Sequence, residues 1–110
     1  MQTSEMTLIG QFAVDSGQAM VGDPCYLDNW EPWNSDSQKF EDYEKSKGQY
    51  SYLGACEATL TKGYGELGNQ AVVFSTGYGD GVYPVYAQFN EDGRVAKIVI
   101  DFIGDDDEYY

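Results

Sequence analysis

Three short turns in this sequence place an aspartate beside a residue with special backbone geometry. They are Asp15-Ser16-Gly17, Gly22-Asp23-Pro24 and Gly79-Asp80-Gly81. Each Asp can serve the turn itself, because its side chain bonds nearby amides. If the turns instead converge at one end of a sheet, they form a ligand pocket lined by Asp15, Ser16, Asp23, Tyr26, Tyr78, Asp80 and Tyr83. The sequence leaves both interpretations open.

A pocket of clustered carboxylates would support one of two kinds of chemistry. It could hold a hard cation, Ca²⁺ or Mg²⁺, or one carboxylate with a raised pKa could act as a general acid or base. The spacing of the aspartates specifies neither. The C-terminal DDDE run lacks the pattern of a calcium-binding EF-hand loop, and the glycines of Gly77–Gly81 lack the lysine of a phosphate loop. We therefore assign no cofactor and treat the metal as unknown.

Few side chains suited to catalysis are present. The chain has no histidine, which removes the commonest general base, the usual catalytic triads and the usual zinc ligand. Cys25 and Cys56 form no CxxC motif, and an acidic surrounding disfavours the thiolate. We expect two reduced thiols, no catalytic residue, and a binding protein rather than an enzyme.

The charge balance restricts the partners. Six Lys and Arg against nineteen Asp and Glu give 110 residues a net charge of −13. Phosphate contacts need clustered basic residues, so direct nucleic-acid binding is not expected. Basic protein surfaces and cations remain, although a strong negative charge can also serve solubility alone. No leader or membrane-spanning run is recognised, which predicts a soluble cytoplasmic protein without a membrane partner.

The clearest structural signal is near the C-terminus. Val82–Phe89 and Val95–Phe102 are two strand-like runs separated by Asn90-Glu91-Asp92-Gly93, a pattern typical of a β-hairpin. Thr7–Val14 and Gln18–Gly22 flank the first acidic turn in the same way. They predict an N-terminal hairpin.

The middle of the chain is predicted to hold one helix and two further strands. Ser35 to Gly48 has a capping box and a glycine stop, which indicates a short helix near 36–47. Gln49 to Leu60 alternates and predicts a strand, and Lys62 to Asn69 reads as a glycine-rich turn. Ala71 to Ser75 is a buried-looking strand.

These elements predict a mostly β protein. The spacing of turn signals is typical of a single antiparallel β-sandwich or a small barrel-like sheet of six to seven strands with one short helix. We expect one domain over residues 1–104, followed by a solvated acidic tail over 105–110.

A second group of residues is a candidate partner-binding surface. Two tryptophans lie close together around Pro32, and they form either a lid over the core or an exposed contact surface. The predicted helix adds acidic side chains. The predicted partner-binding residues are Trp30, Trp33, Glu41, Asp42 and Glu44.

Two blocks of the sequence resemble a known family. VDSGQAMVGDPCYLDNW at 14–30 and STGYGDGVYPVYAQFNEDGRVAKIVIDF at 75–102 are similar to the domain of unknown function 4241 family, small proteins of bacteria and their phages. The resemblance implies a mostly β domain of bacterial or phage source and no activity. Residues 31–48 and 104–110 have no counterpart in it. The matching positions are Asp15, Ser16, Gly17, Asp23, Pro24, Gly79, Asp80, Gly81, Tyr83, Pro84, Val85, Gly93, Asp101 and Phe102.

Three functions are compatible with these features. The first is a non-catalytic binding protein, phage-encoded, that inhibits a host protein by occupying its basic, nucleic-acid-binding surface. The second is a small-molecule or divalent-cation site at Asp15, Asp23 and Asp80. The third is self-assembly through the exposed edges of the sheet, with the oligomeric state unknown.

Overall fold

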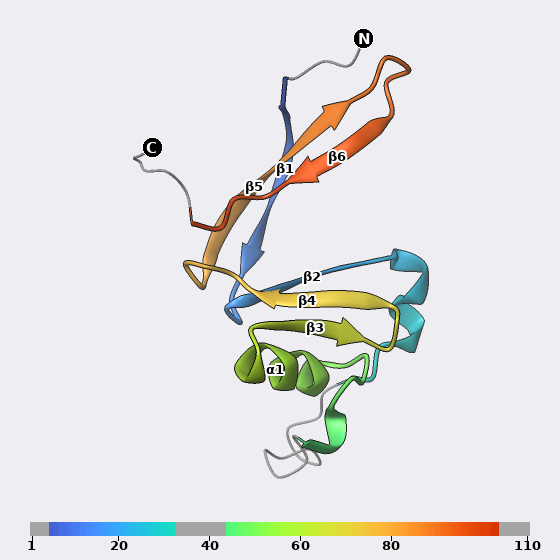
Figure 1. Ribbon diagram of the computed structural model, residues 1–110, viewed down its shortest axis with the longest axis vertical. Helices are drawn as coiled ribbons and strands as arrows, with labels where there is room; N and C mark the ends of the chain where they lie inside the picture. Colours follow the sequence, from blue (N-terminus) through green and yellow to red (C-terminus); the bar gives the residue numbers. More distant parts are fainter. Residues whose placement is uncertain (1–4, 33–43, 104–110) are drawn as a thin grey trace. The chain divides into compact units, whose positions relative to one another are not determined.

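A computed structural model describes residues 5–32 and 44–103, and its contacts group the chain into two units. The terminal unit comprises Met1–Ser16 and Thr76–Tyr110, and the central unit comprises Gly17–Ser75. Each unit contains a three-stranded antiparallel sheet, and neither sheet closes into a barrel (Figure 1). The prediction of a mostly β protein of six to seven strands is thereby confirmed, with six strands in the described residues. A single domain over residues 1–104 stays a prediction.

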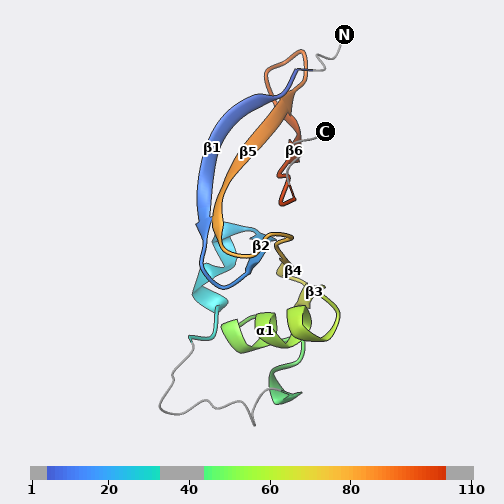
Figure 2. The same cartoon turned by 90° about the vertical axis from the view of Figure 1, so that its left-hand side faces the viewer.

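The sheet of the terminal unit has the order β1-β5-β6. Its strands are β1 (Thr7–Val14), β5 (Gly81–Phe89) and β6 (Val95–Val99). β5 and β6 form the predicted hairpin (Figure 2). Asn90 stabilises its turn, because its side-chain oxygen accepts hydrogen bonds from the Asp92 and Arg94 amides at 2.9 and 3.0 Å. Gly93 adopts a φ of 81°, which few other residues tolerate.

Three aromatic rings pack together inside the terminal unit. The rings of Tyr83 and Phe102 meet edge to face with centroids 4.9 Å apart. Phe12 of β1 lies 6.3 Å from Tyr83 and 6.5 Å from Phe102 by ring centroid. Such tilted pairs bring the positive ring edge to the negative ring face. They hold the segment after β6 beside the sheet.

The sheet of the central unit has the order β2-β4-β3. Its strands are β2 (Gln18–Gly22), β3 (Tyr64–Leu67) and β4 (Ala71–Ser75), all antiparallel. The predicted hairpin between Thr7–Val14 and Gln18–Gly22 is therefore wrong, since β1 pairs with β5 and β2 pairs with β4. The turn residues do redirect the chain, but β1 and β2 belong to different sheets, and each pairs with a strand from later in the chain.

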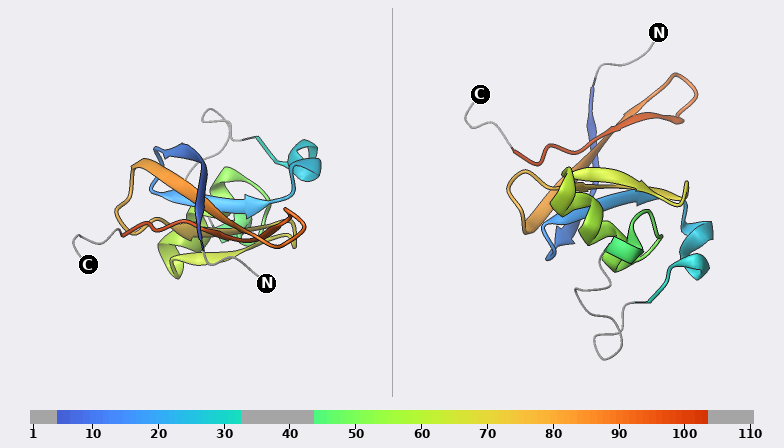
Figure 3. Two further views of the ribbon diagram at one scale, coloured as in Figure 1. Left: turned by 90° about the horizontal axis from the view of Figure 1, so that it is seen from above. Right: turned by 60° about the horizontal axis from the view of Figure 1, so that its bottom comes forward.

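The predicted strand over Gln49–Leu60 is also wrong, because the segment contains the helix α1 (Tyr52–Thr61). Ser51 begins the helix, and its side-chain oxygen accepts a hydrogen bond from the Gly54 amide at 2.9 Å. That N-cap satisfies a donor that would otherwise lack a partner. Helix formers such as Leu, Ala and Glu fill the following turns. In Figure 3, α1 lies against one face of the β2-β4-β3 sheet, and it contacts β3 and β4.

The glycine-rich turn predicted over Lys62–Asn69 contains a strand instead. β3 occupies Tyr64–Leu67, and the turn itself follows it. The Gln70 amide donates to the Leu67 carbonyl oxygen at 2.9 Å, while Gly68 and Asn69 have φ values of 59° and 62°. Two positive φ angles define the turn type whose twist suits a tight hairpin.

The helix predicted near 36–47 lies largely outside the described residues. Its described end is a short 3₁₀ helix, η3 (Glu44–Ser46), and Gly48 follows with a φ of 77°. A second 3₁₀ helix, η1, spans Pro24–Asn29 after β2. The predicted tail over 105–110 also lies outside the described residues. Within 5–32 and 44–103, no helix is long and apolar enough to cross a membrane.

The hydrophobic core of the central unit lies between α1 and its sheet. It consists of buried side chains from the helix, the strands and the turn before the helix, with the Trp30 ring and Ala58 packed against them. Gly65 allows the close approach, because a Cβ at that position would lie 2.9 Å from the Cβ of Ala58. The buried core residues are Tyr50, Ala55, Leu67, Ala71 and Val73.

Candidate functional site

The acidic loop Thr76–Asp80 of the terminal unit is tied together at one carbonyl. Gly79 oxygen accepts hydrogen bonds from the Thr76 hydroxyl at 2.6 Å and from the Tyr83 hydroxyl at 2.7 Å. Thr76 and Tyr83 are both buried, at 4% and 7% exposure. The hydroxyl proton of Tyr83 is therefore already used in a hydrogen bond to the loop. Tyr83 positions the loop rather than offering a free donor to a ligand.

The strand register brings two of the predicted carboxylates to the same place. Val14 of β1 pairs with Gly81 of β5, and this is the last pair of the ladder. Asp15 follows Val14 and Asp80 precedes Gly81, so the two flank the same end of the sheet. Both are exposed, as is Ser16. The terminal unit thus presents a pair of carboxylates at one sheet end.

Tyr78 completes the predicted set in the terminal unit. Its side chain is 72% exposed, and its amide donates to the Phe102 carbonyl oxygen at 3.2 Å. The loop and the segment after β6 are therefore joined by a backbone hydrogen bond. Tyr78 is the most exposed aromatic side chain beside the Asp15 and Asp80 pair.

The remaining two predicted ligand residues belong to the central unit. Asp23 is the N-cap of η1, and its carboxylate accepts a hydrogen bond from the Cys25 amide at 2.9 Å. Its carbonyl oxygen also accepts from the Tyr26 amide at 3.0 Å. Asp23 therefore has the turn-forming role that its neighbours predict. It also lines a hollow of about 190 Å³ together with Leu27.

The predicted pocket thus divides between the two units. One unit holds Asp15, Ser16, Tyr78, Asp80 and Tyr83, and the other holds Asp23 and Tyr26. A shared site at all three aspartates stays a prediction. In the part of the chain that the structure describes, no group of three or more Asp, Glu or Cys side chains is arranged to hold a metal ion.

Of the predicted partner-binding residues, two are described. Trp30 packs on the core, with its ring edge to face on Tyr50 at a centroid distance of 4.9 Å. For Trp30, this packing favours a lid over the core rather than an exposed contact surface. Glu44 is exposed on η3. The other three, Trp33, Glu41 and Asp42, lie outside the described residues.

We expect Tyr83→Phe to loosen the acidic loop without disturbing the ring packing. The variant loses one hydrogen bond to a buried carbonyl, which costs about 1 kcal/mol of unfolding free energy. Amide hydrogen exchange of residues 77–81 should become faster, measured by NMR against the unchanged protein. Tyr86→Phe is the matched control, because Tyr86 is only half-buried on the same strand. Equal exchange rates in both variants would contradict the anchoring role of Tyr83.

Cys25 and Cys56 form no disulfide in this structure, and Cys56 joins a polar contact between α1 and β2. Cys56 sulfur accepts from the Gln18 side-chain amide at 3.5 Å, and Gln18 oxygen accepts from the Thr59 hydroxyl at 3.1 Å. Partial desolvation raises the pKa of Tyr52, and the neighbouring Cys56 side chain raises it further through charge repulsion and a hydrogen bond. The folded state thus favours neutral Tyr52, and stability falls as the pH rises through about 10.

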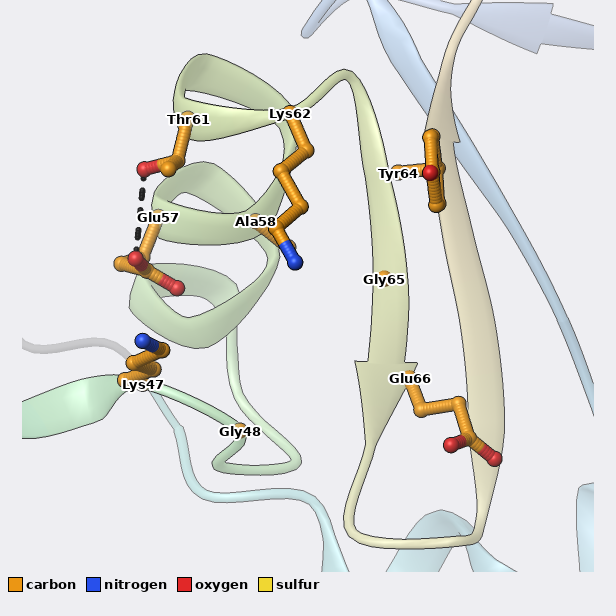
Figure 4. Close-up of a pocket in the computed structure, with 9 residues that line it drawn as sticks. All are labelled: Lys47, Gly48, Glu57, Ala58, Thr61, Lys62, Tyr64, Gly65 and Glu66. Carbon is orange, nitrogen blue, oxygen red and sulfur yellow. Dashed lines mark hydrogen bonds between the residues drawn. The ribbon is translucent and has the colours of Figure 1, made fainter.

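A pocket that the sequence did not predict lies between α1 and β3 in the central unit (Figure 4). It has a volume of about 200 Å³. Glu57, Ala58, Thr61 and Lys62 line it from the helix side, Tyr64, Gly65 and Glu66 from β3, and Lys47 and Gly48 from the turn after η3. The sequence did not predict this pocket because a strand over 49–60, as predicted, would not form its helical side. The sequence signal for the helix was Ser51, a favourable N-cap residue, followed by the helix formers Leu, Ala and Glu.

These features define a small mostly β protein with a three-stranded sheet in each of two units. Its sequence matches the family described as "Protein of unknown function (DUF4241)" over residues 4–100, and the chain belongs to that family. The resemblance drawn from the two sequence blocks is confirmed. No curated protein matches the chain. No solved structure matches it either.

Proposed function

We propose that this protein is a non-catalytic binding protein, phage-encoded and acting in the cytoplasm, that occupies the basic, nucleic-acid-binding surface of a host protein. The exposure of its carboxylates carries the proposal. Within the described residues, eleven of the twelve Asp and Glu side chains are exposed. The same residues include five Lys and Arg side chains, all of them exposed. The exposed carboxylates are Glu5, Asp15, Asp23, Asp28, Glu31, Glu44, Glu66, Asp80, Glu91, Asp92 and Asp101.

The segment around η1 is the best-suited part of this surface. No residue of η1 is buried, and Tyr26 and Leu27 are 41% and 57% exposed beside the carboxylates of Asp28 and Glu31. No Lys or Arg occurs before Lys39. Exposed acidic and apolar groups in a stretch of sequence without Lys or Arg complement a basic groove, where attraction of opposite charges speeds association and selects the partner.

The experiment is affinity capture from a bacterial lysate with the immobilised full chain, followed by binding measurements on the purified captured protein. We expect a DNA-binding or RNA-binding protein that duplex DNA displaces in competition. Raising the salt from about 50 to about 200 mM should weaken its binding at least roughly tenfold. Capture that neither salt nor DNA reduces would contradict the proposal.

A pair of double variants tests the η1 segment directly. Asp28→Asn with Glu31→Gln removes two charges from it, and we expect weaker binding with a shallower salt dependence. Glu91→Gln with Asp92→Asn removes two charges from the β5–β6 turn and is the matched control. Equal losses in the two variants would mean that net charge alone, rather than this segment, attracts the partner.

A further inference from the structure

The pocket between α1 and β3 has a balanced set of charges in a strongly acidic protein. Lys47 and Lys62 supply two ammonium groups, while Glu57 and Glu66 supply two carboxylates. The chain as a whole has a net charge of −13 and only six Lys and Arg. One third of its basic side chains therefore line this one hollow.

Glu57 is the unusual member of the set. Its side chain is 8% exposed, and it is the one buried carboxylate among the described residues. The Thr61 hydroxyl donates to its Oε2 at 3.2 Å. Figure 4 shows that the second carboxylate oxygen points away from Thr61. Burial of a carboxylate is costly unless its oxygens find donors, so a ligand that brings a donor to this second oxygen would be stabilised there.

Small residues form the floor of the pocket. Ala58 of the helix faces Gly65 of β3, and a Cβ on Gly65 would lie 2.9 Å from the Cβ of Ala58. The helix and the strand thus meet directly at these two positions. Longer side chains stand only around them, so the hollow has an apolar floor and a charged rim.

The volume and the charges restrict the ligand. A water molecule occupies about 30 Å³ in the liquid, so about 200 Å³ suits a molecule of roughly seven non-hydrogen atoms. A simple anion would meet Glu57, and a simple cation would meet Lys47 and Lys62. A molecule with both charges can satisfy all of them, because each opposite-charge contact inside a partly dry pocket is stronger than in water.

From these observations we infer that the pocket binds a small zwitterion of the α-amino-acid class, with an apolar side chain. Its ammonium group donates to the second oxygen of Glu57, and its carboxylate accepts from Lys62 at the opposite side of the hollow. Its apolar part lies on Ala58 and Gly65. This site is separate from the acidic η1 segment and does not depend on the function proposed above.

The test is a titration of the full chain with L-valine and with two analogues that each lack one charge. Isobutylamine lacks the carboxylate, and isovalerate lacks the amine. NMR amide shifts are followed up to about 10 mM, which detects a Kd in the millimolar range. We expect L-valine to shift amides over 47–48 and 57–66, with both analogues at least roughly tenfold weaker. No shift with L-valine, or an analogue that binds equally well, would overturn the inference.

Variants assign the two charged contacts. Glu57→Gln and Lys62→Met should each weaken L-valine binding at least roughly tenfold, because each removes a charge-assisted hydrogen bond. Lys62 is exposed, so its variant tests the site even if replacement of buried Glu57 disturbs folding. Glu91→Gln and Lys97→Met, on the β5–β6 hairpin, are matched controls and should bind normally. Unchanged affinity in Lys62→Met would contradict the assigned orientation.

Discussion

Gly54→Ala is expected to lower the free energy of unfolding by about 3 kcal/mol, although it places alanine in a helix. A Cβ on Gly54 would overlap the Gln49 carbonyl oxygen and lie 3.0 Å from the Ser46 carbonyl oxygen. Both are backbone atoms, so no side chain can move aside to relieve the overlap. The turn from Ser46 to Gln49 would have to shift, and with it the buried Tyr50 that follows.

Helix propensity acts in the opposite direction and is the smaller effect. Alanine favours a helix interior over glycine by about 1 kcal/mol, so propensity alone would make the variant more stable. Urea unfolding followed by tryptophan fluorescence measures the sum, since Trp30 packs on Tyr50. Gly10→Ala is the matched control, because nothing lies within 4 Å of a Cβ there. A more stable Gly54→Ala variant would show that the helix does not lie this close to the preceding turn.

Leu67→Ala is expected to destabilise the protein by roughly 2 to 5 kcal/mol. Leu67 ends β3 with 0% exposure and belongs to the core cluster of the central unit. Truncation removes apolar contacts and leaves a cavity that the surrounding backbone fills only in part. The same urea titration measures the change.

Leu60→Ala is the control for this variant. Leu60 lies on α1 in the same unit and is 75% exposed, so its truncation should change the unfolding free energy by less than about 0.5 kcal/mol. The two leucines lie close in sequence and differ in burial. Similar losses for both variants would contradict the packing of β3 against the core.

The predicted features that the structure confirms depend on neighbouring residues. The β5–β6 hairpin follows from Asn90 and Gly93, whose hydrogen bonds and positive φ form the turn without help from the rest of the chain. Asp23 likewise caps η1 through its own near neighbour, Cys25. Interactions over two to four residues are encoded in the order of the residues themselves.

The wrong predictions concern segments whose local signals compete. Tyr50, Tyr52, Cys56, Ala58 and Leu60 alternate as in a strand, yet helix formers and the Ser51 cap share the same stretch. The packing of this segment in the central unit decides between strand and helix. The helix buries Leu53 and Ala55 against the unit, and the small size of Gly54 and Gly65 allows the contact.

The candidate sites show the same difference between signals carried by neighbouring residues and features that depend on packing. The register of β1 with β5 places Asp15 and Asp80 together, and the sequence suggested that convergence through its turns. The pocket of Glu57 and Lys62 was not predicted, because it needs the helix and β3 side by side. Residues of a turn carry their own signal, whereas the wall of a pocket exists only after two elements pack.

The amino-acid sequence by itself determined the mostly β class, the acidic surface, the family and the turns, because composition and short-range geometry are sufficient for these. Only the tertiary structure decided which strands pair, that residues 52–61 form a helix, and where the balanced pocket lies. The physical reason is that burial and backbone pairing act between residues distant in the chain. Their free energy can exceed the small local preferences of each segment.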